Sequence, residues 1–393
     1  MGKKARTAIV GLGFSARSRR EIGSICDLAI DAVIAAVDDA GLQLGDVDGL
    51  LIGRSPSAPY SDLTLQLGNA LGLDHLTLLS SIEGEGTTAI QMVQLAVTAI
   101  EAGMVRNVVC VFSDAPIKPA SATGSAAFRR TMRITGLDDW EVRYGMLAAV
   151  GPHAMAARRY MHVYGATEEH FGAYAVSNRQ WAERNPDASF SSPLSLDDYY
   201  TSRYVAEPLR TLDCAYPVNG AIALVVVDAG AAKDAPRPAV FVHGLGQGHI
   251  RRPGLADVDR MLSSGGTLAA REAYRSASIG PADVDVCQFY DAFSYLGLLS
   301  LEDYGFCKRG EAAEFVREAN CAPGGRLPVN PGGGHLSGFY LQGMTPMSEA
   351  VIQARGDGGA RQAEKNEIVL VTGIGGWLDY HAALVLSPLR SLN

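Results

Sequence analysis

The chain has 393 residues, of which 47% are hydrophobic and 19% charged; this excludes intrinsic disorder and is enough apolar material for a large core. Its 34 Lys and Arg against 42 Asp and Glu leave a formal net charge of −8, which argues against a nucleic-acid scaffold. No apolar run reaches the roughly 18–20 residues that span a bilayer, and the start lacks a secretion signal's apolar stretch. We therefore expect a soluble, cytoplasmic protein of two or three units that binds neither nucleic acid nor membrane.

Strands and helices are predicted to alternate along the first half of the chain, which favours a parallel or mixed sheet covered on both faces. The predicted elements, in chain order, are a strand at 7–10 ending in a glycine turn at 11–13, a helix at 25–40, a strand at 49–53, a helix at 87–102 and a strand at 108–112. The following segment, 114–215, is too long for a loop, so we expect an inserted helical region that caps one end of the fold.

The second half repeats this plan. Its predicted elements are a strand at 239–244, a helix at 267–277, a strand running to 290, a helix at 347–354 and a strand at 368–372. The Asp-Val-Asp sequence at 46–48 recurs at 283–285, at the same spacing from the preceding helix. The linker-like stretch 229–238 separates the two copies, which predicts an α/β protein with an N-terminal unit at 1–235 and a C-terminal unit at 236–393.

Several common kinds of active site have little or no support in the sequence. The Gly11-Leu12-Gly13 turn lacks the third glycine of a dinucleotide fingerprint and is interpreted as a strand end. GxSxG, HExxH and GxxxxGK[ST] motifs are absent from the sequence, and none of the six cysteines forms a CxxC pair that could hold zinc.

Two stretches of the second half are unusually rich in polar and aromatic residues beside glycine. One is 289–295, at the end of a predicted strand, and the other is 329–340, which contains three consecutive glycines. The carboxyl ends of strands are where α/β sheets bind ligands, and glycine lets the backbone approach one closely. Tyr290 and Tyr340 are therefore site candidates; the alternative is that both are half-buried packing residues.

Three further stretches carry a family resemblance. The segments 164–179 and 185–188 are similar to the capping region, and 208–223 to the stretch ending DGAAA, of the thiolase superfamily, with Asn219 for the usual Asp. The chain resembles in particular the sterol-carrier-protein-type thiolases and the thiolase-like lipid-transfer aldolases of steroid side-chain degradation. The resemblance implies a duplicated thiolase fold of two βαβαβ-type halves in five layers, αβαβα, with the helical insertion as its cap.

The chain departs from the thiolase pattern at every catalytic position. Glu83 stands where the nucleophilic Cys opens a helix, and Gly373 replaces the second Cys before a glycine run. Tyr290 takes the place of the Asn of the NEAF motif, and Tyr340 that of the His of the GHP motif. Without a thiolate no thioester acyl-enzyme forms, so thiolysis and Claisen condensation are not expected.

The tyrosine replacements resemble the retro-aldolase branch, which cleaves a β-hydroxyacyl-CoA to a ketone or aldehyde plus a shorter acyl-CoA. The implied roles are Tyr340 as base toward the β-hydroxyl and Tyr290 as acid, with the reverse assignment open; a tyrosine base would need a lowered pKa. The backbone N–H of Gly375 is a candidate for binding the thioester oxygen. His335 is an alternative base or a loop residue bonded to backbone, and Glu83 moves a proton or is a solvated carboxylate.

The resemblance also implies a substrate and partners. The expected substrate is a CoA ester of a bulky hydrophobic acid, such as a steroid with a short side chain, which releases propionyl-CoA or acetyl-CoA; an aromatic acyl group is also open. A separate zinc-ribbon/OB-fold partner protein and a homodimer within an α₂β₂ heterotetramer are expected. We expect neither cofactor nor metal in this chain itself, since CoA belongs to the substrate and zinc to the partner.

Two other functions remain open from the sequence. A non-catalytic acyl-CoA- or lipid-binding scaffold would also lack the thiolase cysteines. A degenerate acyltransferase would use another residue, such as Ser81 or Glu83. The replacement of both polar positions by tyrosine, which can move protons, favours the lyase.

Overall fold

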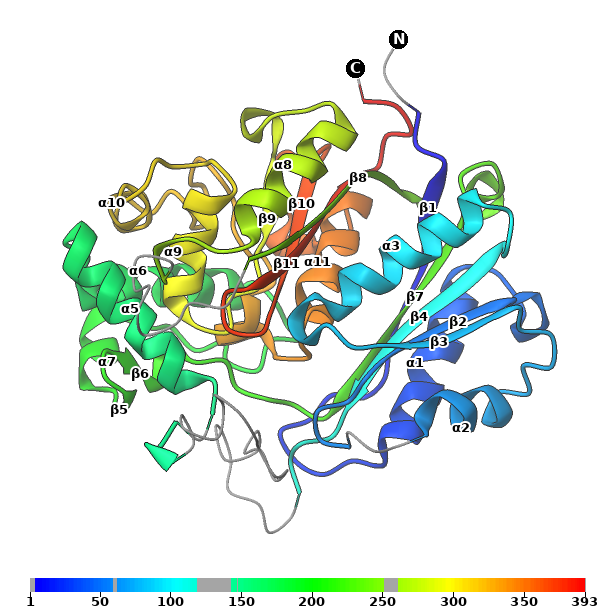
Figure 1. Cartoon of the computed structure of the whole chain (residues 1–393), viewed down its shortest axis with the longest axis horizontal. Coiled ribbons are helices and arrows are strands. Elements are labelled where there is room, and N and C mark those ends of the chain that lie inside the picture. Colours follow the sequence, from blue (N-terminus) through cyan, green and yellow to red (C-terminus); the bar gives the residue numbers. More distant parts are fainter. Residues whose placement is uncertain (1–3, 59–61, 119–142, 147, 251–260, 393) are drawn as a thin grey trace.

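The computed structural model describes residues 4–58, 62–118, 143–146, 148–250 and 261–392. Nine strands form one mixed sheet in the order β3-β2-β4-β7-β1-β8-β11-β10-β9, and two more form a small hairpin (Figure 1). The strands are β1 (Thr7–Phe14), β2 (Gly49–Gly53), β3 (Leu78–Ile82), β4 (Asn107–Asp114), β5 (Tyr204–Ala206), β6 (Leu209–Arg210), β7 (Gly220–Asp228), β8 (Val240–His249), β9 (Val286–Gln288), β10 (Val369–Gly375) and β11 (Tyr380–Ser387).

Helices cover both faces of this sheet. Within the described residues, the α-helices are α1 (Ile25–Asp39), α2 (Leu63–Ala70), α3 (Thr88–Glu101), α5 (Val150–Tyr164), α6 (Glu168–Ala182), α7 (Leu196–Thr201), α8 (Gly266–Ala277), α9 (Ser294–Asp303), α10 (Ala312–Arg317) and α11 (Met344–Arg355). Every strand and helix predicted from the sequence corresponds to one of these elements. None of these helices is long and apolar enough to cross a membrane.

The predicted duplication is visible in the strand order. In the first half the strands follow the order β2-β4-β7-β1 inward from the edge strand β3, and in the second half β9-β10-β11-β8 follow the same plan inward from the edge strand β9. The halves join where β1 pairs with β8, through Ala8 opposite Phe241 and Ile9 opposite Val240. The predicted α/β architecture of two similar halves is confirmed, and the predicted boundary at 235/236 falls in the link between β7 and β8.

Three hydrophobic clusters define the layers. Helices α1 and α2 pack on one face of the first-half strands. Helices α3 and α11 contact strands of both halves and lie near the centre of the molecule (Figure 1). Helices α8 and α9 cover the outer face of the second-half strands. This gives the order helix, sheet, helix, sheet, helix that the resemblance implies.

The glycine turn predicted at 11–13 is wrong. Gly11 and Gly13 lie within β1, because the strand continues to Phe14. A Cβ on Gly13 would lie 2.2 Å from the Ala36 backbone nitrogen of α1, so only glycine permits this close packing of helix on strand. Gly246 of β8 repeats the arrangement, with a Cβ position 2.0 Å from the Ala269 carbonyl of α8. Gly13 and Gly246 therefore lie where a helix packs closely on a strand. Neither glycine ends its strand.

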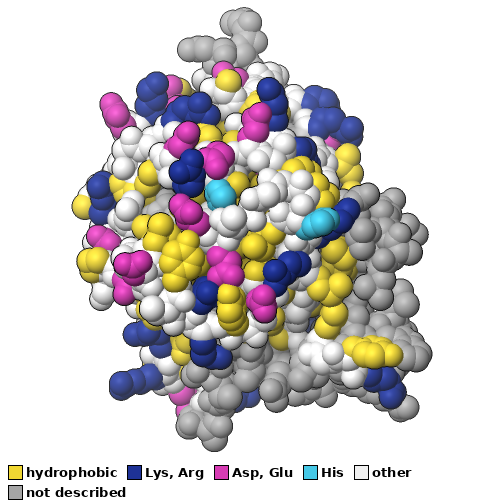
Figure 2. All heavy atoms as spheres, turned by 90° about the vertical axis from the view of Figure 1, so that its left-hand side faces the viewer, with side chains coloured by type: hydrophobic (Ala, Val, Ile, Leu, Met, Phe, Trp, Pro, Cys, Tyr) yellow, Lys and Arg dark blue, Asp and Glu magenta, His cyan; other side chains and the backbone are white. Residues whose placement is uncertain are grey.

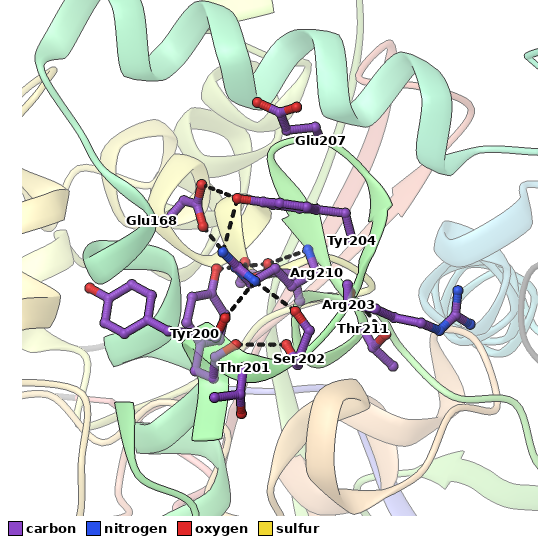
Figure 3. A network of polar contacts seen from close by, with 12 residues as sticks. Glu168, Tyr200, Thr201, Ser202, Arg203, Tyr204, Glu207, Arg210 and Thr211 are labelled. Carbon is purple, nitrogen blue, oxygen red and sulfur yellow. Dashed lines mark hydrogen bonds and ion pairs between the residues drawn. The ribbon is translucent and has the colours of Figure 1, made fainter. Parts of the chain in front are cut away.

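The predicted insertion at 114–215 is helical in its described part, which holds α5, α6, α7 and the β5–β6 hairpin. Arg210 fixes the hairpin to α6, because its Nε lies 2.7 Å from Glu168 Oε2 (Figure 3). The same guanidinium donates to the Tyr204 hydroxyl at 2.9 Å, and that hydroxyl donates to Glu168 at 2.7 Å. Figure 2 shows that side chains of both charges and apolar side chains are interspersed on the side of the molecule that this region forms.

Candidate active site

The two tyrosines singled out in the sequence meet at the end of the sheet. Tyr290 follows β9, and Tyr340 follows a short π-helical turn at Gly334–Gly338. Their hydroxyl oxygens are 2.7 Å apart, a hydrogen bond in which either oxygen can donate. Tyr290 is 7% exposed and Tyr340 is only partly buried, so Tyr340 is the one that solvent reaches more easily. The distant sequence segments thus form one pair of phenols.

Polar side chains tie the two tyrosine segments to each other. Asn330 accepts a hydrogen bond from the Phe289 backbone N–H at 2.7 Å and donates to the carbonyl of the same residue at 3.2 Å. The carboxyl of Asp291 accepts from the His335 backbone N–H at 2.8 Å. The Tyr290 backbone N–H donates to Thr372 of β10 at 3.2 Å. These bonds fix the loop after β9 against both the 330–335 turn and β10.

The imidazole of His335 packs against both phenol rings. Its ring centroid lies 4.6 Å from that of Tyr290 and 4.9 Å from that of Tyr340, both edge-to-face. Its Nε2 lies 2.9 Å from the Gln342 carbonyl, to which it must donate, and its Nδ1 lies 3.4 Å from Asp291 Oδ1. Burial lowers the pKa of His335 to about 3, so the ring is neutral. Both ring nitrogens are therefore directed at groups other than the phenols.

The surroundings of the two tyrosines raise the pKa of both phenols, whereas a tyrosinate base would need a lowered pKa. Burial raises the pKa of Tyr290 well above 10 and also raises that of Tyr340, because a phenolate would lose its hydration. The carboxylate of Glu85 raises both pKa values further. Both hydroxyls are consequently protonated at neutral pH, and a proton can pass between them only by exchange along their hydrogen bond.

Gly375, the candidate donor to a thioester oxygen, ends β10 beside the turn at 84–86. A Cβ on Gly375 would lie 2.3 Å from the Gly84 carbonyl oxygen. A Cβ on Gly86 would lie 2.1 Å from the Ile374 carbonyl oxygen and 2.3 Å from Tyr290 Cε2. The 84–86 turn therefore touches both the end of β10 and the ring of Tyr290. The structure brings Tyr290, Tyr340, His335 and Gly375 into one site.

The two residues considered for a degenerate acyltransferase, one in β3 and one directly after it, lie on the surface. Ser81 is exposed, and the side chain of Glu83 is 61% exposed and paired with Arg54. Glu85, which the sequence analysis missed, is instead the carboxylate next to the glycine run, where it accepts from the Gly376 N–H at 2.7 Å. Asp291 was also missed as a site residue. Its position beside Tyr290 was a usable signal, whereas nothing in the sequence distinguishes Glu85 from Glu83.

A groove of about 560 Å³ runs along α5. Its lining consists of apolar and charged side chains: Gly151, Ala154, Met155, Arg158, Arg159, His162, Ala206, Glu207 and Met261. His153, on the same helix, packs its ring 4.7 Å from that of Phe293 and bonds the Tyr295 hydroxyl at 2.6 Å. Helix α5 therefore connects the groove to the loop that carries Tyr290. The residues that the structure describes contain no group of three or more His, Cys, Asp or Glu placed to hold a metal ion.

Asp291→Asn is expected to weaken the pH dependence of stability. Burial raises the pKa of Asp291 to about 7 from 3.8, so between about pH 4 and pH 7 the folded chain holds a proton that the unfolded chain releases. Unfolding free energy thus falls as pH rises through this window, by up to about 1.4 kcal/mol per pH unit. The asparagine keeps an acceptor for the His335 N–H and does not titrate.

Urea unfolding of both proteins at pH 5 and pH 7.5 measures this effect. The wild type should lose more stability than Asp291→Asn between the two pH values. The other buried carboxyls, among them Asp213 with a pKa of about 6, titrate in both proteins and cancel in the comparison. Equal losses in the two proteins would contradict a raised pKa at Asp291.

The comparisons with known proteins agree with the fold and cover nearly the whole chain. The thiolase N-terminal domain family matches residues 3–232, and the thiolase C-terminal domain-like family matches residues 249–388. The chain belongs to the thiolase superfamily. Its fold is similar to that of the Acat5 thiolase from Ascaris suum in complex with coenzyme A, with a TM-score of 0.69 and 13% identity over 98% of this chain and all of the other.

Among members of this superfamily, the chain is similar to steroid side-chain-cleaving aldolases. It is 34% identical to the 17-hydroxy-3-oxo-4-pregnene-20-carboxyl-CoA lyase of Mycobacterium tuberculosis, over 94% of this chain and 97% of the relative. It is also 34% identical to the steroid side-chain-cleaving aldolase of Thermomonospora curvata, over 94% and 95%. A solved structure of an Ltp2-ChsH2(DUF35) aldolase matches with a TM-score of 0.86 and 34% identity, over 97% of both chains.

Proposed function

We propose that this chain is a carbon–carbon lyase that cleaves a β-hydroxyacyl-CoA by a retro-aldol reaction, yielding a ketone or aldehyde and a shorter acyl-CoA. The observation that carries the proposal is the hydrogen-bonded pair of protonated phenols, Tyr290 and Tyr340, at 2.7 Å. The similarity to two aldolases or lyases at 34% identity over nearly the full length supports it. A retro-aldol step needs proton transfer and enolate binding but no covalent nucleophile.

In this reaction the tyrosine pair acts as a relay. As the bond between the α- and β-carbons breaks, three protons move in concert along the pair. Tyr290 gives its proton to the α-carbon, Tyr340 gives its proton to Tyr290, and Tyr340, the more accessible phenol, takes the proton of the β-hydroxyl. The electrons of the broken bond pass through the thioester enolate to the new α-carbon–hydrogen bond, and the β-carbon becomes a carbonyl. No proton is gained or lost, so the raised pKa values of both phenols are compatible with turnover.

The thioester oxygen is placed at the end of β10 in this proposal. The Gly375 N–H would donate to the oxygen that becomes the enolate, close to the 84–86 turn and to Tyr290. A backbone donor held at a fixed position stabilises charge that develops during the reaction, and removing one such donor typically costs 10²–10³ in kcat. Gly375 therefore completes a site of which the tyrosines supply the proton chemistry.

The proposed substrate is the CoA thioester of a steroid with a short hydroxylated side chain, and the expected product is propionyl-CoA or acetyl-CoA. The names of the two similar lyases support a steroid acyl group. An aromatic β-hydroxyacyl-CoA is the alternative. Cleavage of the steroid ester and not the aromatic ester, at equal concentration, would decide between them.

We place the nucleotide of CoA in the groove along α5, where basic side chains can bind its phosphates. Arg158→Ala is expected to raise KM for the acyl-CoA by about 10-fold with kcat nearly unchanged, because the loss of one charge-assisted contact weakens ground-state and transition-state binding equally. Steady-state kinetics measures the split. Arg271→Ala, which removes an exposed arginine of α8, is the matched control and should leave both constants unchanged. An unchanged KM in Arg158→Ala would exclude this arginine from CoA binding.

The proposed assembly is an α₂β₂ complex with a zinc-ribbon/OB-fold partner, in which zinc belongs to the partner. The name of the Ltp2-ChsH2(DUF35) aldolase supports a partner protein. Strand β3 is one edge of the nine-stranded sheet, and within the described residues its outer side has no strand partner. Pairing of this side with β3 of a second copy would form the homodimer within the complex. Light scattering on the co-purified complex should give the mass of two copies of each chain.

The proposed function is tested by co-expressing the chain with such a partner and supplying β-hydroxyacyl-CoA thioesters. Mass spectrometry should detect the ketone or aldehyde together with propionyl-CoA or acetyl-CoA. A folded complex that binds the thioesters but leaves all of them intact would contradict a lyase and favour an acyl-CoA-binding scaffold. Transfer of the acyl group to another thiol, without a carbonyl product, would instead favour an acyltransferase.

A further inference from the structure

Glu85 has a backbone conformation that non-glycine residues rarely adopt. Its φ is +49°, although it lies between two glycines that could have supplied a left-handed conformation more easily. Of the five non-glycine residues with positive φ in the described part of the chain, three lie at the tyrosine site: Glu85, Asn330 and Gln342. Backbone strain of this kind persists where neighbouring structure enforces it, and it concentrates at functional sites.

The roles of the other two strained residues are visible in their contacts. Asn330 holds the Phe289 backbone through two hydrogen bonds, and the Gln342 carbonyl receives His335 Nε2 at 2.9 Å. Each therefore orients a segment or ring that packs against a catalytic candidate. Glu85 makes the corresponding contact on the third side of the site, since its Oε2 accepts from the Gly376 N–H at 2.7 Å.

This bond links two segments with very little room between them. Besides the contacts of Gly86 and Gly375, a Cβ on Gly373 would lie 2.6 Å from the Gly86 carbonyl, and a Cβ on Gly343 would lie 2.4 Å from the same oxygen. Backbone therefore meets backbone across the junction. The Glu85 carboxylate bonds across it, to the peptide immediately after Gly375.

We infer that Glu85 is a positioning residue for the proposed lyase reaction: its carboxylate holds the Gly375–Gly376 turn so that the Gly375 N–H faces the thioester oxygen. The inference rests on the proposed function for its effect on turnover. What turnover requires of Glu85 is an oxygen that accepts the hydrogen bond of the Gly376 N–H. The negative charge of the carboxylate is not required. The charge lies near both phenols and disfavours their ionisation, which is compatible with a relay between neutral hydroxyls.

Three variants distinguish the hydrogen-bond acceptor of Glu85 from its negative charge and from its backbone strain. Glu85→Gln keeps an oxygen acceptor of the same reach without charge, Glu85→Ala removes the acceptor, and Glu85→Gly removes both the acceptor and the backbone strain. Glu83→Ala is the matched control, because Glu83 is a glutamate two residues away whose carboxylate bonds Arg54. All four are compared as the folded complex with the partner.

The expected kinetics follow from loss of a transition-state contact. Glu85→Ala and Glu85→Gly should lower kcat by about 10- to 100-fold with KM changed less than about 2-fold, while Glu85→Gln and Glu83→Ala stay within about 3-fold of the wild type. Rescue by Glu85→Gln is the result that a general loss of stability would not produce. Activity of Glu85→Ala equal to that of Glu83→Ala would overturn the inference, and so would a Glu85→Gln variant as slow as Glu85→Ala.

Amide hydrogen exchange gives a readout that does not depend on activity. Peptides containing Gly376 should exchange faster in Glu85→Ala and Glu85→Gly than in the wild type, Glu85→Gln or Glu83→Ala. If the wild type cleaves no β-hydroxyacyl-CoA, the proposed function fails, and faster exchange in Glu85→Ala would still support the contact. If the wild type is active and exchange at Gly376 is unchanged in Glu85→Ala, the inference fails alone.

Discussion

Replacing Tyr340 with phenylalanine is expected to reduce kcat by about 10²–10⁴-fold, the range typical of a lost general acid or base. The variant removes one oxygen and keeps the ring that packs against His335 at 4.9 Å. Without that hydroxyl, the β-hydroxyl proton of the substrate cannot reach Tyr290, and the relay is broken. Binding of the acyl-CoA should change less than about 2-fold, because the pocket keeps its shape. Kinetics together with a binding titration measures both quantities.

Tyr290→Phe should have a similar effect, because the proton must pass through both hydroxyls. Tyr200→Phe is the control, since Tyr200 is a 42% exposed tyrosine of α7 on the cap, and it should keep full activity. A Tyr340→Phe variant with wild-type turnover would contradict the relay. If only one of the two site variants lost activity, a single tyrosine would carry the proton transfer without the other.

Gly86→Ala is expected to lower both stability and activity. The added Cβ would lie 2.1 Å from the Ile374 carbonyl oxygen and 2.3 Å from the ring of Tyr290, and neither contact can be kept. Overpacking of a dense interior typically costs about 1–3 kcal/mol. The ring of Tyr290 and the end of β10 must move apart from the 84–86 turn, and displacement of a reacting group by about 1 Å can cost about 10²-fold in rate.

Urea unfolding and kinetics on the same preparation measure the two effects. The control is Gly45→Ala, because a Cβ at Gly45 would meet nothing within 4 Å. It should leave turnover unchanged and stability within about 0.5 kcal/mol. Unchanged turnover in a folded Gly86→Ala protein would contradict the close packing of this turn on Tyr290.

Much of the fold could be predicted because hydrophobic patterns determine the elements. Helix α1 and strand β2 have almost the predicted bounds, since the buried residues of α1 recur at helical spacing along one face and every residue of β2 is buried. The interpretation of Gly11 and Gly13 failed because glycine in a strand pattern has two meanings. A turn needs its conformational freedom, whereas packing on α1 needs its missing side chain, and only the position of the helix distinguishes them.

The sequence predicts that the two candidate tyrosines lie close together, but it does not predict their electrostatics. The sequence motifs bring Tyr290 and Tyr340 to the same strand ends, but they do not reveal that burial raises both pKa values. Our proposal therefore has a relay between neutral phenols in place of a tyrosine base with a lowered pKa. The roles of Glu85 and Asp291 depend on contacts between segments far apart in the chain, such as Glu85 with Gly376, and spacing in the sequence does not report them.

The most direct test of retro-aldol cleavage through the tyrosine pair is a reaction in D₂O. The complex is given the β-hydroxyacyl-CoA that it cleaves, and the released acyl-CoA is examined by mass spectrometry at short times. In D₂O the hydroxyl groups of the substrate and of both tyrosines carry deuterium. Proton transfer through the phenols therefore predicts a released acyl-CoA with a single deuterium at its α-carbon, together with a carbonyl co-product. Tyr340→Phe should release little of either product. Released acyl-CoA without deuterium, or an acyl group covalently attached to the chain, would contradict this mechanism.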